Sequence, residues 1–299
     1  NSALSNTNRF TSPSKKGRVN NITTEIYRIV RQISANQAFP FTSSVQGGRR
    51  NFEVVDADFI DGSYFYERHP DPLNSFGIIY RNDGLGISSA NSGFFVLFKQ
   101  GVLASKTFNF TTPIPSRTQD LEVNSINQTD LWLQEIRPTG SVISKWTQIP
   151  NTVGQTVNFN AQQANTRDLY AVESLFGDQV RFKFTDGNFG RIPTGVYRAW
   201  YRTSDGENYM IQPEEMKNKT VTIPYTNQQG ENYDLQITFS LQTAVNNGLP
   251  TESISNIKKN ASQVYYTQNR MVSAQDYNVF PYSKSSNIQK LKAVNKTHA

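Results

Sequence analysis

Hydrophobic and polar residues alternate along much of the chain, which is the pattern of half-buried β-strands. Every second residue is apolar from Val180 to Phe184, and again from Tyr233 to Leu241. Shorter apolar runs, separated by Asp-Gly, Pro-Asp-Pro and Gly-x-Gly turn residues, fill the stretch from Asn51 to Phe98. The pattern predicts a mainly β protein of hairpin-rich or sandwich-like sheets in several domains, with a smaller α/β part.

The turn residues predict how the strands follow one another. The strand Leu131–Ile136 runs into Arg-Pro-Thr-Gly and returns through Val142–Trp146, which predicts a hairpin. A Thr-Asn-Gln-Gln-Gly loop joins Val221–Tyr225 to the alternating run that follows it, and this predicts a second hairpin. We interpret the Gly-rich turn after Phe184 as a further connection between two paired strands, the second of them around Tyr197.

The apolar spacing becomes helical towards the C-terminus. Ile254 and Ile257 open a set of apolar residues about three or four positions apart, which predicts a helix starting near Pro250. Ser273 with Asp276 resembles a capping box and predicts a short second helix. A strand-like run, Ile288 to Val294, follows, so a short helical segment and a final strand are expected near the C-terminus.

The N-terminal residues are rich in Ser, Asn and Thr, with one apolar run from Thr23 to Ile33. Its spacing predicts a helix that docks against something else. The run Phe94 to Phe98 is apolar without alternation, which fits either a strand buried on both faces, the interpretation we favour, or an interface. The predicted parts are residues 1–50, a linker with the docking helix; 51–100, a small β unit or elaborated loops; 101–245, the β-rich core; and 246–299, the helical segment with the final strand.

Composition narrows the class of protein further. Only 36% of the 299 residues are hydrophobic, and Phe and Tyr carry an unusual share of them, as expected for strands with one polar face. No window approaches the roughly 18 apolar residues of a membrane-spanning helix, so no membrane insertion is expected. The net charge of +6 is spread along the chain, which predicts no nucleic-acid partner. The absence of an initiator Met suggests a piece of a longer polypeptide.

Candidate chemistry is scarce in the sequence. The chain has no Cys and only two histidines, His69 and His298, and it lacks nucleophile-elbow, phosphate-loop and zinc-protease motifs. The run Asp56 to Gly62 resembles a calcium loop, but Ile60 supplies no oxygen ligand where one is needed. The sequence therefore predicts no catalytic residue, no cofactor and no metal site.

Two segments are informative through their order and separation. Residues 184–195 read Phe-Thr-Asp-Gly-Asn-Phe-Gly-Arg-Ile-Pro-Thr-Gly, and residues 269–277 read Asn-Arg-Met-Val-Ser-Ala-Gln-Asp-Tyr. Together with the helix-like stretch before the second segment, they resemble the central region of baseplate J-like proteins, the wedge subunits of contractile-tailed phages. The positions that match the family pattern are Phe184, Asp186, Gly187, Gly190, Pro193, Gly195, Glu252, Arg270, Asp276 and Tyr277. One departure is Thr185, where the family has Gly.

The residues also have an interpretation independent of the resemblance. Asp186, Gly187 and Gly190 suit a tight turn, because glycine reaches positive φ and Asp closes turns through its side chain. Arg270 is either an exposed charge or a structural partner of Asp276.

The resemblance implies a structural component of the virion rather than an enzyme. A wedge subunit would be assembled in the host cytoplasm, bind other baseplate wedge and hub proteins and occur in multiple copies around the tail's sixfold axis, with a homodimer as a further option. It would rearrange as the sheath contracts. The alternative is a tail-associated protein that binds a receptor or glycan, which aromatic, Asn-rich strands would also suit and which would place Trp and Tyr on an exposed concave face.

Overall fold

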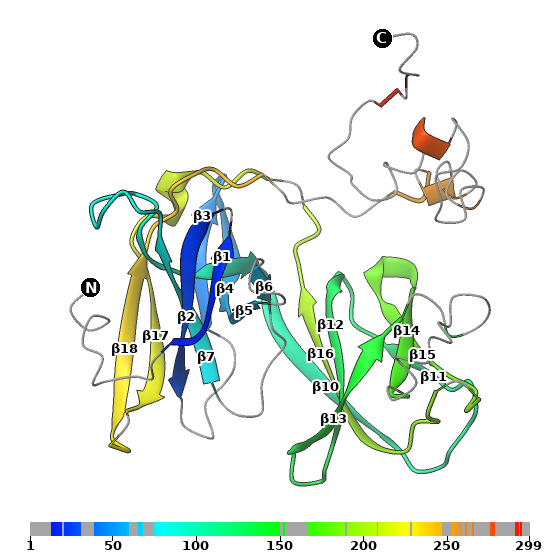
Figure 1. The fold of residues 1–299 in the computed structure, drawn as a ribbon. Helices are drawn as coiled ribbons and strands as arrows, with labels where there is room; N and C mark the ends of the chain where they lie inside the picture. Colours follow the sequence, from blue (N-terminus) through cyan, green and yellow to red (C-terminus); the bar gives the residue numbers. More distant parts are fainter. Residues whose placement is uncertain are drawn as a thin grey trace. The chain divides into compact units, whose positions relative to one another are not determined.

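The structure is a computed structural model of the whole chain, and it forms two compact units (Figure 1). The first unit comprises residues 1–205 and 210–246, and the second comprises 206–209 and 247–299. The structure describes residues 13–19, 21–30, 39–59, 65–67, 75–149, 152, 167–188, 190–207, 209–227, 229–246, 253–255, 257–258, 261, 265, 276–278, 291–292 and 294.

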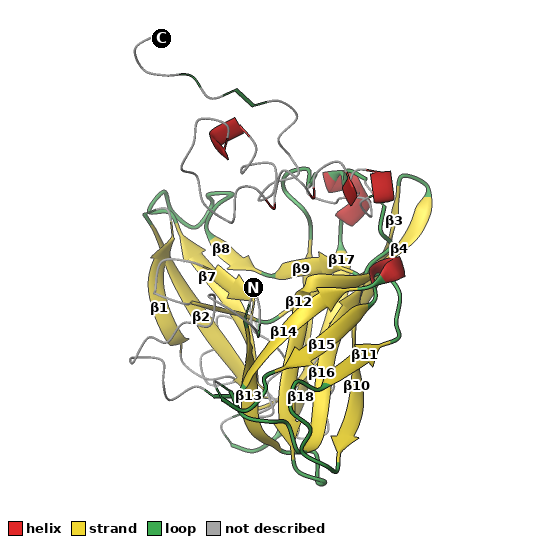
Figure 2. Ribbon diagram, turned by 90° about the vertical axis from the view of Figure 1, so that its right-hand side faces the viewer, coloured by secondary structure: helices red, strands yellow, loops and turns green. Residues whose placement is uncertain are grey.

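Strands dominate the first unit, as Figure 2 shows, and the predicted mainly β fold is confirmed. Among the described residues before position 101 there are nine strands: β1 (Pro13–Val19), β2 (Ile22–Val30), β3 (Phe39–Val45), β4 (Gly48–Val55), β5 (Ala57–Phe59), β6 (Phe65–Glu67), β7 (Ser75–Asn82), β8 (Gly93–Phe95) and β9 (Leu97–Gln100). They form three sheets, with strand orders β1-β2-β7-β8, β3-β4-β9 and β5-β6. Of the residues described in the chain, none forms a helix long and apolar enough to cross a membrane.

The next seven strands form one sheet that curls into a half-barrel. They are β10 (Val102–Phe110), β11 (Thr118–Leu121), β12 (Ile126–Ile136), β13 (Val142–Gln148), β14 (Leu169–Ser174), β15 (Val180–Phe184) and β16 (Gly195–Thr203), in the order β10-β16-β12-β13-β14-β15-β11. All neighbours are antiparallel except β13 and β14. Alternate side chains from the strands fill the inside of the curl, among them Phe110, Leu133, Trp146, Tyr170 and Phe182.

The last two strands, β17 (Lys219–Thr226) and β18 (Asn232–Phe239), form the predicted second hairpin. Although they are distant in sequence from the N-terminal strands, β17 packs on β3, and the ring of Phe239 lies 5.1 Å from that of Phe41 (Figure 1). A 3-10 turn, η3 (Pro213–Met216), precedes the hairpin, and another, η2 (Phe176–Asp178), precedes β15.

The predicted docking helix from Thr23 to Ile33 is wrong. Residues 22–30 form the strand β2, paired on one side with β1 and on the other with β7. Its β-branched Ile, Thr and Val side chains favour a strand, and apolar residues on both faces of a central strand imitate helical spacing. Ile26 and Ile29 are both fully buried.

Two further predictions about strands need correction. The run Phe94–Phe98 is not one doubly buried strand: it is divided between β8 and β9, which belong to different sheets, and its side chains are half-buried. The strands on either side of the Gly-rich turn, β15 and β16, do not pair with each other. Each has other neighbours within the half-barrel, because the turn crosses from one part of the curled sheet to another. The hairpin of β12 and β13 is confirmed.

The second unit contains the helical segment. Ile254, Ile257 and Asp276 are helical as predicted, but both isoleucines are exposed, by 57% and 48%. In the predicted strand Ile288 to Val294 only Leu291, Lys292 and Val294 are described, and none of these three is in a strand.

Candidate functional site: a buried charge network and a glycine-containing turn

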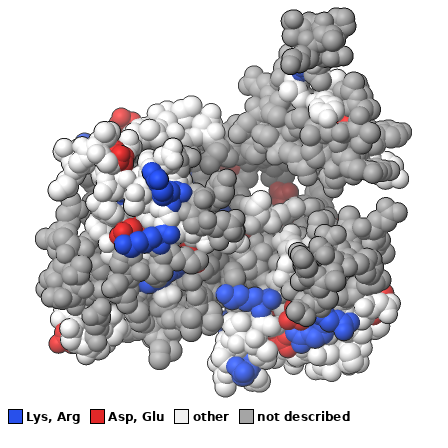
Figure 3. Space-filling view, in the orientation of Figure 1, with Lys and Arg blue, Asp and Glu red and all other residues white. Residues whose placement is uncertain are grey.

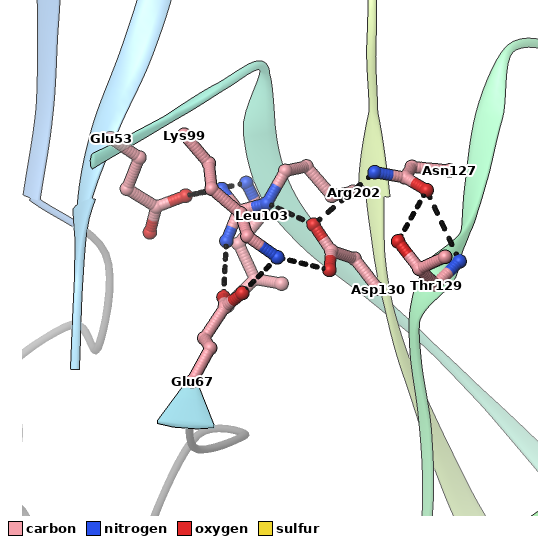
Figure 4. A network of polar contacts seen from close by, with 8 residues as sticks. All are labelled: Glu53, Glu67, Lys99, Leu103, Asn127, Thr129, Asp130 and Arg202. Atoms are coloured by element: carbon pink, nitrogen blue, oxygen red, sulfur yellow. Dashed lines mark hydrogen bonds and ion pairs between the residues drawn. The ribbon is translucent and has the colours of Figure 1, made fainter. Parts of the chain in front are cut away.

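A buried arginine holds three carboxylates together in the first unit. Arg202, near the end of β16, is only 2% exposed. Its Nη1 donates to Glu53, its Nε lies 3.0 Å from Oδ2 of Asp130, and its Nη2 lies 3.2 Å from Oε1 of Glu67 (Figure 4). All three carboxylates therefore converge on one guanidinium.

A lysine adds a second cation to this network. Nζ of Lys99 lies 2.6 Å from Oδ1 of Asp130 and also pairs with Glu67. Burial raises the pKa of Glu53 and of Glu67, and the cations Arg202 and Lys99 offset this only in part. With three acids and two bases, the network has one carboxyl group in excess of its cations.

The network joins elements that lie far apart in the sequence. Glu53 belongs to β4, Glu67 to β6 and Lys99 to β9, whereas Asp130 and Arg202 belong to β12 and β16 of the half-barrel. Buried charges are stable only when paired and hydrogen-bonded, so this arrangement fixes the N-terminal strands to the half-barrel. Among the described residues no group of acids or histidines has the arrangement of a metal site.

The first six residues of the predicted motif run from the last residue of β15, through the turn, to the first residue of β16. The Phe184 ring is buried in the half-barrel core. Asp186 accepts hydrogen bonds from the backbone N–H of Asn188 at 3.0 Å and from its side chain at 2.8 Å, and these bonds lower the Asp186 pKa. Gly187 has a φ of 100°, a conformation that side chains disfavour. The turn interpretation of these residues is therefore supported by geometry.

The second glycine of the motif is required by packing rather than by φ. A Cβ at Gly190 would lie 2.5 Å from Oγ1 of Thr185, and Thr185 is itself buried. The Thr185 side chain thus occupies the space beside Gly190. Pro193 is buried, and Gly195 opens β16 at a φ of 95°.

Arg191, inside the motif, anchors the turn to the half-barrel and was missed by the sequence analysis. Its Nε donates to Asp168 at 2.7 Å, its Nη atoms donate to Glu135, and its guanidinium lies 5.2 Å from the Trp146 ring centroid. These hydrogen bonds raise the pKa of Arg191 and keep it charged. The feature of the sequence that could have indicated this role is the position of the arginine between the turn glycine and the Ile-Pro pair.

The remaining four motif residues belong to the second unit. Asp276 and Tyr277 are helical residues of the second unit, and Tyr277 is 48% exposed. Glu252 and Arg270 lie outside the described residues. The calcium-like run is explained by ion pairs instead, because Arg28 lies 2.9 Å from Asp56 and 3.2 Å from Asp58.

An ordered loop between β7 and β8 exposes two aliphatic side chains. Asp83 accepts from the backbone N–H of Leu85 at 2.9 Å and from the hydroxyls of Ser89 and Ser92. These bonds lower the Asp83 pKa, with the Ser89 hydroxyl contributing most. Leu85 is nevertheless 78% exposed and Ile87 96% exposed. Such side chains on an internally bonded loop suit a contact with another molecule.

Among the described residues on the face drawn in Figure 3, Lys and Arg lie in separate groups, several of them beside Asp or Glu. Fold and site together define a multi-sheet β protein whose most deeply buried charged side chains, among the described residues, join its sheets. Residues 1–244 match the family model described as Domain of unknown function (DUF8360), and the chain belongs to this family. No curated protein matches the chain.

Proposed function

We propose that this protein is a non-catalytic structural subunit of the baseplate wedge of a contractile phage tail. The observation that carries the proposal is the ordered resemblance to baseplate J-like proteins through residues 184–195 and 269–277. Its partners would be other wedge and hub proteins of the tail baseplate.

The geometry of the first motif supports this proposal. Gly187 has a φ of 100°, where a side chain would be strained, so the resemblance includes a residue with a physical requirement. Arg191 then binds the turn to the half-barrel through Asp168 and Glu135. A turn that requires a glycine and an ion-paired arginine is matched by chance less often than an exposed Asp-Gly pair.

The buried charge network also supports the proposal, because it would let the sheets of the subunit move together as one rigid body. A subunit that rearranges during sheath contraction must keep its own sheets fixed while it transmits force. Arg202 joins the N-terminal strands to the half-barrel through Glu53 and Asp130, all at most 2% exposed. The exposed Leu85 and Ile87 offer a surface for a neighbouring subunit.

The second candidate is a tail-associated receptor- or glycan-binding protein, and its aromatic pair lies on the outer face of the curl rather than on the concave face expected for such a site. Trp132 and Trp200 are register partners on β12 and β16, and they lie on the face opposite the core residues Leu133 and Ala199. Both indoles are half-buried, and Nε1 of Trp200 donates to Gln134 at 3.0 Å. Paired aromatic rings beside an amide could stack on a sugar.

Electron microscopy of virions carrying a label on this subunit tests the proposal. A wedge subunit places the label in a ring close to the hub, at every sixfold position. Label found solely at fibre tips would reject the wedge assignment and would favour the receptor- or glycan-binding alternative.

A further inference from the structure

Strand β18 has an outer edge that no other strand covers within the described part of the chain. It pairs with β17 over eight residues without a register shift and has no further neighbour in its sheet. Proteins usually protect such edges with charged side chains, Pro or a bulge; β18 has no Lys, Pro or bulge, and Asp234 is its one charged residue. An edge of this kind is a template for another strand.

The backbone groups that point outwards can be assigned. The N–H of Asn227 donates to Glu231 at 2.8 Å, so this pair is hydrogen-bonded. Hydrogen-bonded and non-hydrogen-bonded pairs alternate along an antiparallel hairpin. The neighbouring pair, Thr226 with Asn232, is therefore not hydrogen-bonded, nor is every second pair after it, and the backbone N–H groups of these residues face away from the partner strand. The outward-facing residues of β18 are Asn232, Asp234, Gln236 and Thr238.

The edge of β17 is different. Pro224 is the register partner of Asp234, so the missing N–H falls at an outward position in the middle of β17. This edge is therefore interrupted where the β18 edge is continuous. The hairpin is able to accept a further strand on one side.

Burial across the hairpin points to a missing neighbour on the same side. The apolar side chains of β17 that face the protein interior, Val221 and Ile223 among them, are at most 5% exposed. On β18, Leu235 is buried, but Tyr233 is 39% exposed and Ile237 is half-buried. The apolar side chains of this face are thus less well covered on β18, the strand with the free edge, than on β17.

We propose that a second copy of this chain pairs antiparallel with β18 about a two-fold axis at Leu235, giving a continuous sheet β17-β18-β18-β17. In this register Asp234 of each copy faces Gln236 of the other, and Asn232 faces Thr238. All four outward-facing residues then form hydrogen-bonded pairs. The sequence of the strand is self-complementary, as a symmetric interface requires.

The side chains favour this register over the symmetric register centred on Asp234. It places a carboxylate opposite an amide, and it sets Tyr233 beside Ile237 of the second copy, which covers the two partly exposed apolar residues. A shift of the axis to Asp234 would place Asp234 opposite its own copy, and like charges directly opposite each other are unfavourable. A change of the strand register by one residue would place outward-facing backbone N–H and C=O groups opposite inward-facing ones, and the hydrogen bonds between the two copies would be lost.

The variant Gln236→Pro tests the pairing, because it removes an outward N–H and breaks no bond to β17. We expect the full-length chain to dimerise in sedimentation equilibrium, and Gln236→Pro to weaken the dimer at least about tenfold. The matched variant Gln236→Ala keeps the N–H and should change the dissociation constant less than about threefold. Both variants should retain the thermal unfolding temperature of the parent within a few degrees. A monomeric parent, or equal dissociation constants for the two variants, would overturn the proposal.

The register has its own test, because the chain contains no Cys. Mixing Asp234→Cys with Gln236→Cys under mild oxidation should give a mixed disulfide dimer far more readily than either variant alone, since hydrogen-bonded partners lie about 5.5 Å apart. Equal cross-linking in all three samples would contradict the register. The inference names a partner for the proposed wedge subunit, yet it is separable: monomers in solution would reject the pairing and leave the ring label as the test of function.

Discussion

Replacing Arg202 with Met should destabilise the first unit by about 3–5 kcal/mol, the usual cost of breaking a buried ion pair by removing one partner. Arg202 is 2% exposed, and the substitution would remove the ion pair of the buried Glu53 and leave the buried Asp130 paired with Lys99 alone. Urea unfolding followed by tryptophan fluorescence would measure the loss. Adding Glu53→Gln to Arg202→Met should recover part of the stability, because it removes one uncompensated charge.

The matched control lies on the same strand. Arg198 of β16 is half-buried, contacts the Gly140 carbonyl at 3.5 Å and lies 5.7 Å from the Trp200 ring centroid. Arg198→Met should cost less than about 1 kcal/mol, as for a weak cation–π contact. Equal losses for the two variants would show that Arg202 contributes no more than any arginine of β16, against the role we assign to it.

The second large effect is expected at Gly101, between β9 and β10. Its φ is 95°, its N–H donates to Asn51 at 2.9 Å, and a Cβ there would lie 2.0 Å from the Thr203 carbonyl oxygen. Gly101→Ala should therefore combine about 1–3 kcal/mol of overpacking with about 1–3 kcal/mol of backbone strain. The same urea titration measures the sum.

Gly86 separates these two contributions. Its φ of 100° is close to that of Gly101, but a Cβ there would meet nothing within 4 Å. Gly86→Ala should lose only the strain, so its destabilisation should be clearly smaller. If both alanine variants unfold at the same urea concentration, the predicted clash with Thr203 does not exist.

The elements that the sequence predicted best are those with one buried and one wet face. The hairpin of β17 and β18, the strand β15 and the turn after Ile136 follow from alternation and turn residues alone. Where a strand carries buried apolar residues on both faces, as β2 does with Ile26 and Ile29, alternation disappears and the spacing resembles a helix. For β2, the strand propensity of its β-branched residues predicts the structure better than the spacing of its apolar residues does.

The partners of strands and of buried charges could not be read from local pattern. Pairing of β16 with β10 and β12, rather than with β15, depends on the closing curl of the half-barrel. Arg202 and Glu53 are 149 positions apart and have no signature that links them. The glycines of the motif were predicted, whereas the ion pairs that hold Arg191 became visible only through the fold.

The most direct test of the assembly role is the mass of the complex that forms when the full-length protein is co-expressed with the products of neighbouring genes. The account predicts a non-covalent complex that contains more than one copy of this chain and at least one other tail component. A full-length protein that stays monomeric, captures no tail component and cleaves a glycan would contradict it.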